Sequence, residues 1–200
     1  VDEDGRVTQM VAEEMRAWHA GRSSWKGETD INSCSIGIEI ANPGHDWGYA
    51  DFPPSQVRSV IDLCRDILSR HPIPPERVLA HSDVAPARKI DPGEKFPWGR
   101  LADEGIGPWV EPGPPDDGFL CRPGEERPAI LDLQSKLAAY GYGIEITGVC
   151  DDRTETVLRA FQRHFRPSRV DGLADASTAD TLDRLVAGLD RPPPPSPRSS

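Results

Sequence analysis

Two short apolar segments in the first half of the chain have the pattern of β-strands. In 35–40, isoleucines alternate with Gly37 and Glu39, which predicts a strand with one apolar face. The run 78–80 predicts a short buried strand that delivers His81 at its end.

Between these segments, apolar residues recur every three or four positions. The spacing over 57–68 predicts a helix, with Ser55 as its N-cap and prolines at 72 and 74 after its end. Strand, helix and strand together predict an α/β fold, with a mixed central sheet flanked by helices.

The second half of the chain carries the helical period throughout. Apolar residues at spacings of three and four predict helices over 130–140, 152–165 and 175–189. Asp152 and Asp175 can cap the second and third of these helices. We therefore expect an all-helical, three-helix domain.

Composition shifts divide the chain into four parts. A Pro/Gly-rich stretch predicts a linker over 111–125, between a first domain, 1–110, and the three-helix domain, 126–190. The Pro-rich segment 191–200 has no apolar residue to bury and is expected to be a disordered tail. The chain opens in the middle of a predicted strand, so we expect further residues before Val1, including the first strand of the sheet.

Composition also excludes some classes of function. A net charge of -10 argues against nucleic-acid binding, which depends on Lys and Arg contacts to phosphate. No apolar run approaches the ~18–20 residues of a membrane helix. The four cysteines, at 34, 64, 121 and 150, form no CxxC pair. They are expected either to form two disulfides or to be buried as small apolar residues, the latter favoured for Cys64.

Candidate chemistry is concentrated in 80–93. His81 and Asp91 offer a neutral nitrogen and an anionic oxygen, both good zinc ligands. Lys89, two residues before Asp91, would lie on the same side of an extended segment, where a cation can stabilise an oxyanion. The alternative to a metal site is that 80–93 forms an ordinary surface loop. Glu39 either faces a cleft, where it could act as a general base, or pairs with a cation.

Aromatic and histidine residues supply the remaining candidates. His19 could line a substrate groove with Trp18 or Trp25 stacking on sugar or peptide; alternatively, a Trp packs in the core with His19 at its rim. His45 and His164 belong to no constellation and are expected at the surface.

These motifs, taken together, resemble a known family. The sequences Trp18-His19-Ala20-Gly21, 35–39 and 80–93 are similar to those of type 2 N-acetylmuramoyl-L-alanine amidases, relatives of the peptidoglycan recognition proteins. The region 126–190 resembles a three-helix peptidoglycan-binding domain, on pieces such as Phe161-Gln162 and Asp171-Gly172.

The resemblance implies a mechanism and a set of site residues. Two of the family's three zinc ligands correspond to His81 and Asp91. The third ligand, a His, is expected upstream of Val1. Glu39 corresponds to the residue that activates water, and Lys89 to the residue that stabilises the transition state. Substrate binding is assigned to three residues: Trp18, His19 and Arg88.

The implied activity is zinc-dependent hydrolysis of the bond between N-acetylmuramic acid and L-alanine. The partner is peptidoglycan or a muropeptide, and the protein is expected to be a monomer without a membrane-spanning segment. The cell envelope or periplasm is favoured, with the cytoplasm as the alternative compartment. A non-catalytic peptidoglycan-binding or sensing protein is the alternative function.

Overall fold

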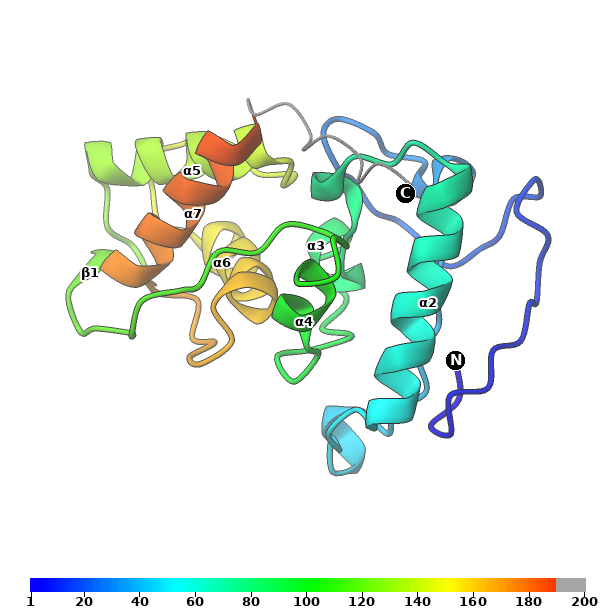
Figure 1. Cartoon of the computed structure of the whole chain (residues 1–200). Helices are drawn as coiled ribbons and strands as arrows, with labels where there is room; N and C mark the ends of the chain where they lie inside the picture. Colours follow the sequence, from blue (N-terminus) through cyan, green and yellow to red (C-terminus); the bar gives the residue numbers. More distant parts are fainter. Residues whose placement is uncertain (190–200) are drawn as a thin grey trace, which may run out of the picture.

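Helix α2, Pro54–Arg70, forms one side of the molecule, and three further helices form the other (Figure 1). The computed structural model describes residues 1–189, so the tail expected at 191–200 lies outside the described residues. Short helices lie between the two sides: α3, His81–Val84, and α4, Trp98–Ala102. Single helical turns complete the first half: α1 at Ile31–Cys34, η1 at His45–Trp47 and η2 at Pro75–Arg77.

The helix predicted over 57–68 is present as α2, but its N-cap is not the predicted one. The helix begins at Pro54 after Pro53, and the Ser55 hydroxyl donates to the Glu3 carbonyl instead of capping. Proline at the first helical position needs no hydrogen-bond partner and already has helical φ, which explains this start. On one face of α2, apolar residues enter a core with Phe96, Trp98 and Leu101.

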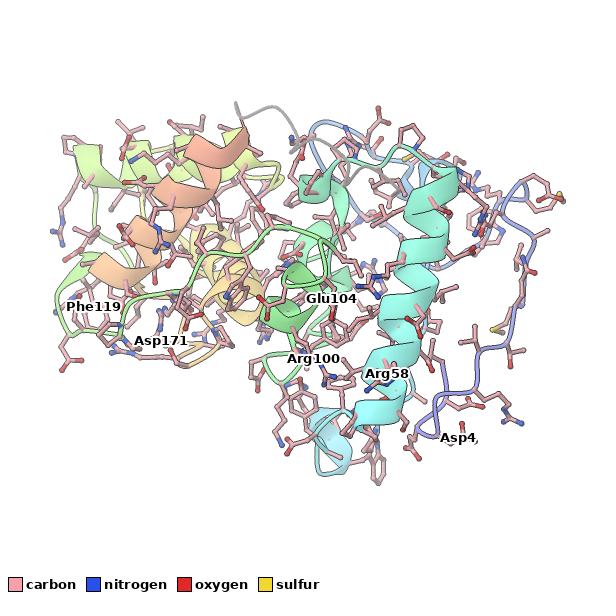
Figure 2. The ribbon with its side chains drawn as sticks, in the orientation of Figure 1. Asp4, Arg58, Arg100, Glu104, Phe119 and Asp171 are labelled. Carbon is pink, nitrogen blue, oxygen red and sulfur yellow. A yellow bond between two sulfur atoms is a disulfide. The ribbon has the colours of Figure 1, made fainter. Side chains whose placement is uncertain are left out.

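Helix α4 packs against α2 through this core, and a surface ion pair adds to the contact. Arg65 of α2 bonds to Glu104, which follows α4 and faces α2 in Figure 2. Both side chains are partly exposed, so the pair contributes little to stability compared with the apolar contacts.

The central sheet predicted from 35–40 and 78–80 is not formed within residues 1–189. Both segments are extended or irregular, yet no backbone hydrogen bond joins them. Instead, both line a cavity of about 570 Å³. Among residues 1–189, Val1 alone pairs with the first segment. Its N–H donates to the Glu39 carbonyl at 2.6 Å, and its carbonyl accepts from the Ala41 N–H at 2.9 Å. A strand exists only where a neighbour pairs with its backbone groups, and here the cavity separates the two edges.

The second half contains helices where the spacing predicts them. These are α5, Pro128–Tyr140, α6, Asp152–Phe165, and α7, Ala176–Leu189. The carboxylate of Asp151, not Asp152, caps α6 by accepting from the Thr154 N–H at 2.8 Å. Asp175 accepts from Thr178 N–H at 2.7 Å at the start of α7, as predicted.

This half is not purely helical, contrary to the prediction. A two-stranded antiparallel sheet pairs β1, Phe119–Cys121, with β2, Ala174–Asp175. A disulfide joins Cys121 to Cys150, so β1 is fastened to the chain just before α6. Cys34 and Cys64 are free thiols, and burial raises the pKa of Cys64 to about 11. None of the helices in the described part has both the length and the apolar character needed to cross a membrane.

One apolar core extends across both halves of the chain. Its members from the first half include Trp25, Ile31 and Val84, and those from the second include α5, α6 and α7 residues such as Leu137 and Phe161. The indole of Trp25 is 1% exposed and meets the ring edges of Tyr140 and Tyr142. Of the two roles considered for Trp25, the structure shows packing in the core.

Candidate active site

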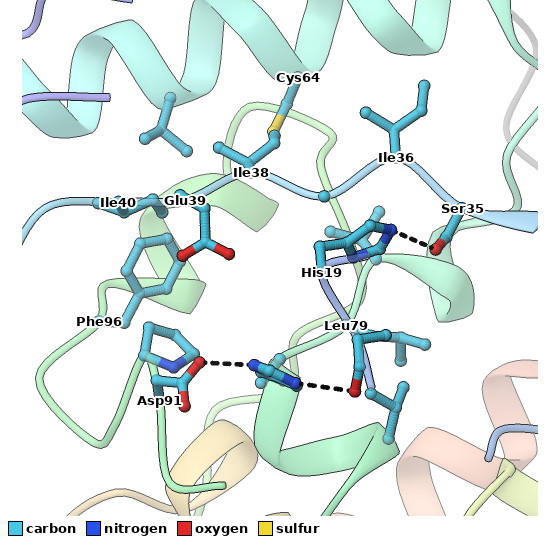
Figure 3. A pocket seen from close by; sticks show the side chains of 18 of the residues that line it. His19, Ser35, Ile36, Ile38, Glu39, Ile40, Cys64, Leu79, Asp91 and Phe96 are labelled. Atoms are coloured by element: carbon cyan, nitrogen blue, oxygen red, sulfur yellow. Dashed lines mark hydrogen bonds and ion pairs between the residues drawn. The ribbon is translucent and has the colours of Figure 1, made fainter. Parts of the chain in front are cut away.

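Helix α3 begins at His81 and directs its imidazole toward Asp91. Nδ1 of His81 lies 2.9 Å from Oδ2 of Asp91, and Nε2 lies 3.1 Å from the Ala20 carbonyl oxygen (Figure 3). The Ser82 N–H donates to the Asp91 carbonyl at 3.1 Å, which fixes the two segments together. The nine residues between His81 and Asp91 therefore form a closed loop that brings the two side chains into contact.

Opposing effects act on the pKa of Asp91. Partial burial raises the pKa, whereas the hydrogen bond and charge of His81, with a contribution from Lys89, lower it. The lowering effects prevail, and the pKa lies below the usual value of an aspartate. The carboxylate is therefore anionic at neutral pH, as a metal ligand must be.

Glu39 faces the same space from the opposite segment. Ile36 and Ile38 point toward α2, whereas Glu39 points away from it, toward His19 and Asp91 (Figure 3). The alternation that the sequence predicts is thus present without a paired sheet. Of the two explanations considered for a carboxylate in this position, the structure supports a face that opens onto a cavity.

His19 is held beside Glu39 by contacts that depend on a glycine. A Cβ at position 37 would lie 2.5 Å from Cγ of His19, so Gly37 allows the ring to pack against the backbone. Nε2 of His19 lies 3.2 Å from the Ser35 hydroxyl. Oδ1 of the buried Asn32 accepts from the N–H groups of His19 and Ala20. No sequence pattern indicates this role of Asn32, because its burial in the helical turn α1 is a property of the fold.

The cavity brings together most of the predicted site residues. Its lining includes Trp18, His19, Glu39, His81, Lys89 and Asp91, along with apolar residues of α2. Trp18 is 81% exposed at the rim, where the Arg16 guanidinium stacks 4.1 Å from its ring centroid. Arg88 is not among the lining residues. Its guanidinium donates to the carbonyls of Ala20 and Arg22, so it fastens the loop that contacts His81.

His81 and Asp91 fit part of a zinc site. An imidazole nitrogen and a carboxylate oxygen are typical zinc donors, and their separation of 2.9 Å allows both to face one ion. Within residues 1–189, however, no three His, Cys, Asp or Glu side chains are grouped to hold a metal. His19 therefore does not complete the set, and the structure provides two donors of the three that a catalytic zinc site uses.

Each half of the chain matches a known protein family. A model of the N-acetylmuramoyl-L-alanine amidase family matches residues 1–94, and a peptidoglycan binding domain model matches residues 126–182. The N-acetylmuramoyl-L-alanine amidase AmiD of Escherichia coli is 40% identical over 186 residues, which cover 90% of this chain and 67% of the relative. The 1,6-anhydro-N-acetylmuramyl-L-alanine amidase AmpD of Enterobacter cloacae is 38% identical over 98 residues, covering 49% of this chain and 50% of AmpD.

Solved structures agree with these relatives. The Escherichia coli AmiD complex with anhydro-N-acetylmuramic acid-L-Ala-D-gamma-Glu-L-Lys superposes with a TM-score of 0.76 at 39% identity, covering 92% of this chain and 73% of AmiD. The AmpDh3 protein of Pseudomonas aeruginosa gives a TM-score of 0.75 at 36% identity, with the same coverage. The chain thus spans between half and three quarters of these proteins. On this similarity, and on the match across its first half, the chain belongs to the N-acetylmuramoyl-L-alanine amidase family.

Proposed function

We propose that the protein hydrolyses the amide bond between N-acetylmuramic acid and the L-alanine of peptidoglycan or of muropeptides. The observation that carries this proposal is the convergence of His81, Asp91, Glu39 and Lys89 on one cavity in a chain of this family. The AmiD relative binds an anhydromuropeptide as its substrate, which indicates the class of ligand.

His81 and Asp91 would hold a zinc ion, together with a third donor from outside the described residues. When bound, zinc supplies Lewis-acid polarisation of the water and of the amide carbonyl. Nε2 of His81 faces the Ala20 carbonyl, which orients the ring and leaves Nδ1 for the metal.

Glu39 serves as general base and then as general acid. Its carboxylate takes a proton from the water whose oxygen attacks the carbonyl carbon. As the carbon–nitrogen bond breaks, the same proton passes to the leaving amine of L-alanine. Lys89 lines the cavity, where its ammonium would stabilise the negative charge that develops on the carbonyl oxygen.

The second half would hold the wall polymer near the site. Its match to peptidoglycan binding domains supports this role. The net charge of -10 makes general electrostatic attraction to an anionic wall ineffective, so the contact is local. The Cys121–Cys150 disulfide supports an oxidising compartment such as the cell envelope.

A non-catalytic peptidoglycan-binding protein is the second candidate, because the described residues supply two metal donors, not three. Mass spectrometry of muropeptides after incubation with the purified protein decides between the two. The amidase is expected to release intact stem peptides and to leave sugars whose N-acetylmuramic acid carries a free carboxylate. Chelation of zinc should stop this release. Binding to muropeptides without any cleavage, in protein loaded with zinc, would establish the second candidate.

Wall binding is tested on the whole chain, because the two halves share a core. The protein is expected to co-sediment with purified sacculi and to remain in the supernatant when the sacculi are first digested to soluble fragments. Sedimentation that persists after digestion would indicate self-association, and a supernatant fraction in both cases would remove the wall-binding role.

A further inference from the structure

A fully buried carboxylate lies two residues after His81 and has no part in the chemistry above. Asp83, at the third position of α3, is 0% exposed. Its Oδ2 accepts from the Ala80 N–H at 2.8 Å and so caps the helix that carries His81. A buried charge of this kind is costly unless several donors compensate it.

The second half of the chain provides those donors. The Tyr142 hydroxyl donates to Oδ1 of Asp83 at 2.7 Å, and Nδ1 of His164 lies 2.7 Å from Oδ2. The sequence suggested a surface position for His164, but its side chain is buried, at 1% exposed. Its ring is stacked between Trp98, at 3.9 Å between centroids, and Phe165, at 3.8 Å. Burial, together with the charge of Asp83, raises the pKa of Tyr142 well above its usual value, so the phenol remains a donor.

Helix α3 depends on these contacts for its orientation. It has four residues, and a helix of one turn is not stable by itself because the cost of nucleation exceeds the gain of its few hydrogen bonds. The capping carboxylate of Asp83 joins this turn to the second half by hydrogen bonds, next to the apolar contacts of Val84. Any rotation of α3 that broke the bonds to Tyr142 and His164 would also turn His81 away from Asp91.

A second connection reaches His81 from the same side. The Ala20 carbonyl, which faces Nε2 of His81, belongs to the loop that continues to Trp25. Ser24 N–H donates to the Val84 carbonyl at 2.8 Å, and Lys26 N–H donates to the Gly141 carbonyl at 2.9 Å. The loop that faces Nε2 of His81 is thus bonded both to α3 and, through Gly141, to the second half of the chain.

We propose that His164 and Tyr142 are positioning residues of the active site, which orient His81 through the buried carboxylate of Asp83. On this view the second half of the chain has a role beyond wall binding, since it supports the loop from His81 to Asp91. The kinetic consequence rests on the proposed amidase function, whereas the structural consequence does not.

Tyr142→Phe and His164→Phe test the proposal, because each removes one donor to Asp83 and keeps an aromatic ring. Loss of outer-shell partners of a metal site typically lowers activity by about 10–100-fold. We expect kcat on an anhydromuropeptide to fall about tenfold in each variant, with KM within about twofold of the parent value. In protein kept free of added metal, the ring nitrogen signals of His81 in NMR spectra should shift in both variants.

Two further variants separate positioning from general packing. Tyr140→Phe removes a hydroxyl from the same aromatic cluster without touching Asp83, and should leave kcat and the His81 signals unchanged. His164→Asn restores a donor near the place of Nδ1 and should recover most of the loss. Unchanged His81 signals in both Phe variants, even with a lower melting temperature, would overturn the proposal. Shifted His81 signals in a protein without amidase activity would support positioning and contradict the proposed function.

Discussion

Replacing Glu39 by glutamine is expected to remove most of the amidase activity while leaving the protein folded. Glutamine keeps the size of the side chain and cannot accept a proton from water at neutral pH. General acid–base catalysis typically contributes about 10²–10⁴-fold, so kcat should fall within that range. The hydrolysis of an anhydromuropeptide, followed by mass spectrometry, measures the loss.

The location of Glu39 allows the substitution to change activity without changing stability. Its side chain is exposed on the cavity lining, outside both apolar cores, so little stability depends on it. Zinc content should also stay at the parent level, because the proposed ligands are His81 and Asp91. Glu14→Gln, at another exposed glutamate away from the cavity, is the matched control and should retain full activity. Parent rates in the Glu39 variant would show that another group moves the proton.

The helices of this protein were predictable from sequence because their signal is local. Apolar spacing over 57–68 reports which face of α2 is buried, and the same holds for α5, α6 and α7. Caps were off by one or two residues where two candidates compete, as with Asp151 and Asp152 at the start of α6. The alternation in 35–40 also predicted correctly which side Glu39 faces.

Pairing between distant segments was not predictable in the same way. The apolar alternation of 35–40 says nothing about which strand lies beside it, and within residues 1–189 only Val1 does. The four cysteines likewise gave no pairing, because spacing alone does not show that Cys121 and Cys150 approach each other. A disulfide requires a short distance between two Cα atoms, here 5.8 Å, which only the fold determines.

The candidate site divides along the same line. Motif resemblance selected His81, Asp91, Glu39 and Lys89, and all four line one cavity. The contact between Asp83 and His164 spans 81 residues and crosses from one half of the chain to the other, so no local pattern reports it. A lone histidine on a helix looks the same in sequence whether its partner is water or a buried carboxylate.

Replacing Trp25 by alanine is expected to destabilise the whole molecule, not one half of it. The indole is almost fully buried against Tyr140 and Tyr142, with ring centroids 5.9 Å and 4.9 Å away. Truncation of a buried Trp to Ala typically costs about 3–5 kcal/mol of the free energy of unfolding. Because Trp25 belongs to the first half and its partners to the second, the two halves should lose stability together.

The fit around Trp25 explains why little of this loss can be recovered by repacking. Gly141 lies so close that a Cβ there would be 2.5 Å from Cε2 of the indole. The Lys26 N–H donates to the Gly141 carbonyl at 2.9 Å, which holds the two backbones at a fixed separation. The space vacated by the indole should therefore remain largely as a cavity, and cavities of this kind account for the upper part of the range.

Urea denaturation followed by circular dichroism measures this effect, with Trp47→Ala as the matched control. Trp47 is 82% exposed, so its removal should change the free energy of unfolding by less than about 0.5 kcal/mol. The parent protein should unfold in a single transition, and the Trp25 variant should do so at a lower midpoint. Two separate transitions in the parent, or a loss below about 1 kcal/mol in the Trp25 variant, would show that the halves fold independently. Since the support of His81 by Tyr142 and His164 requires the two halves to be docked, that result would also remove the structural basis of the positioning role.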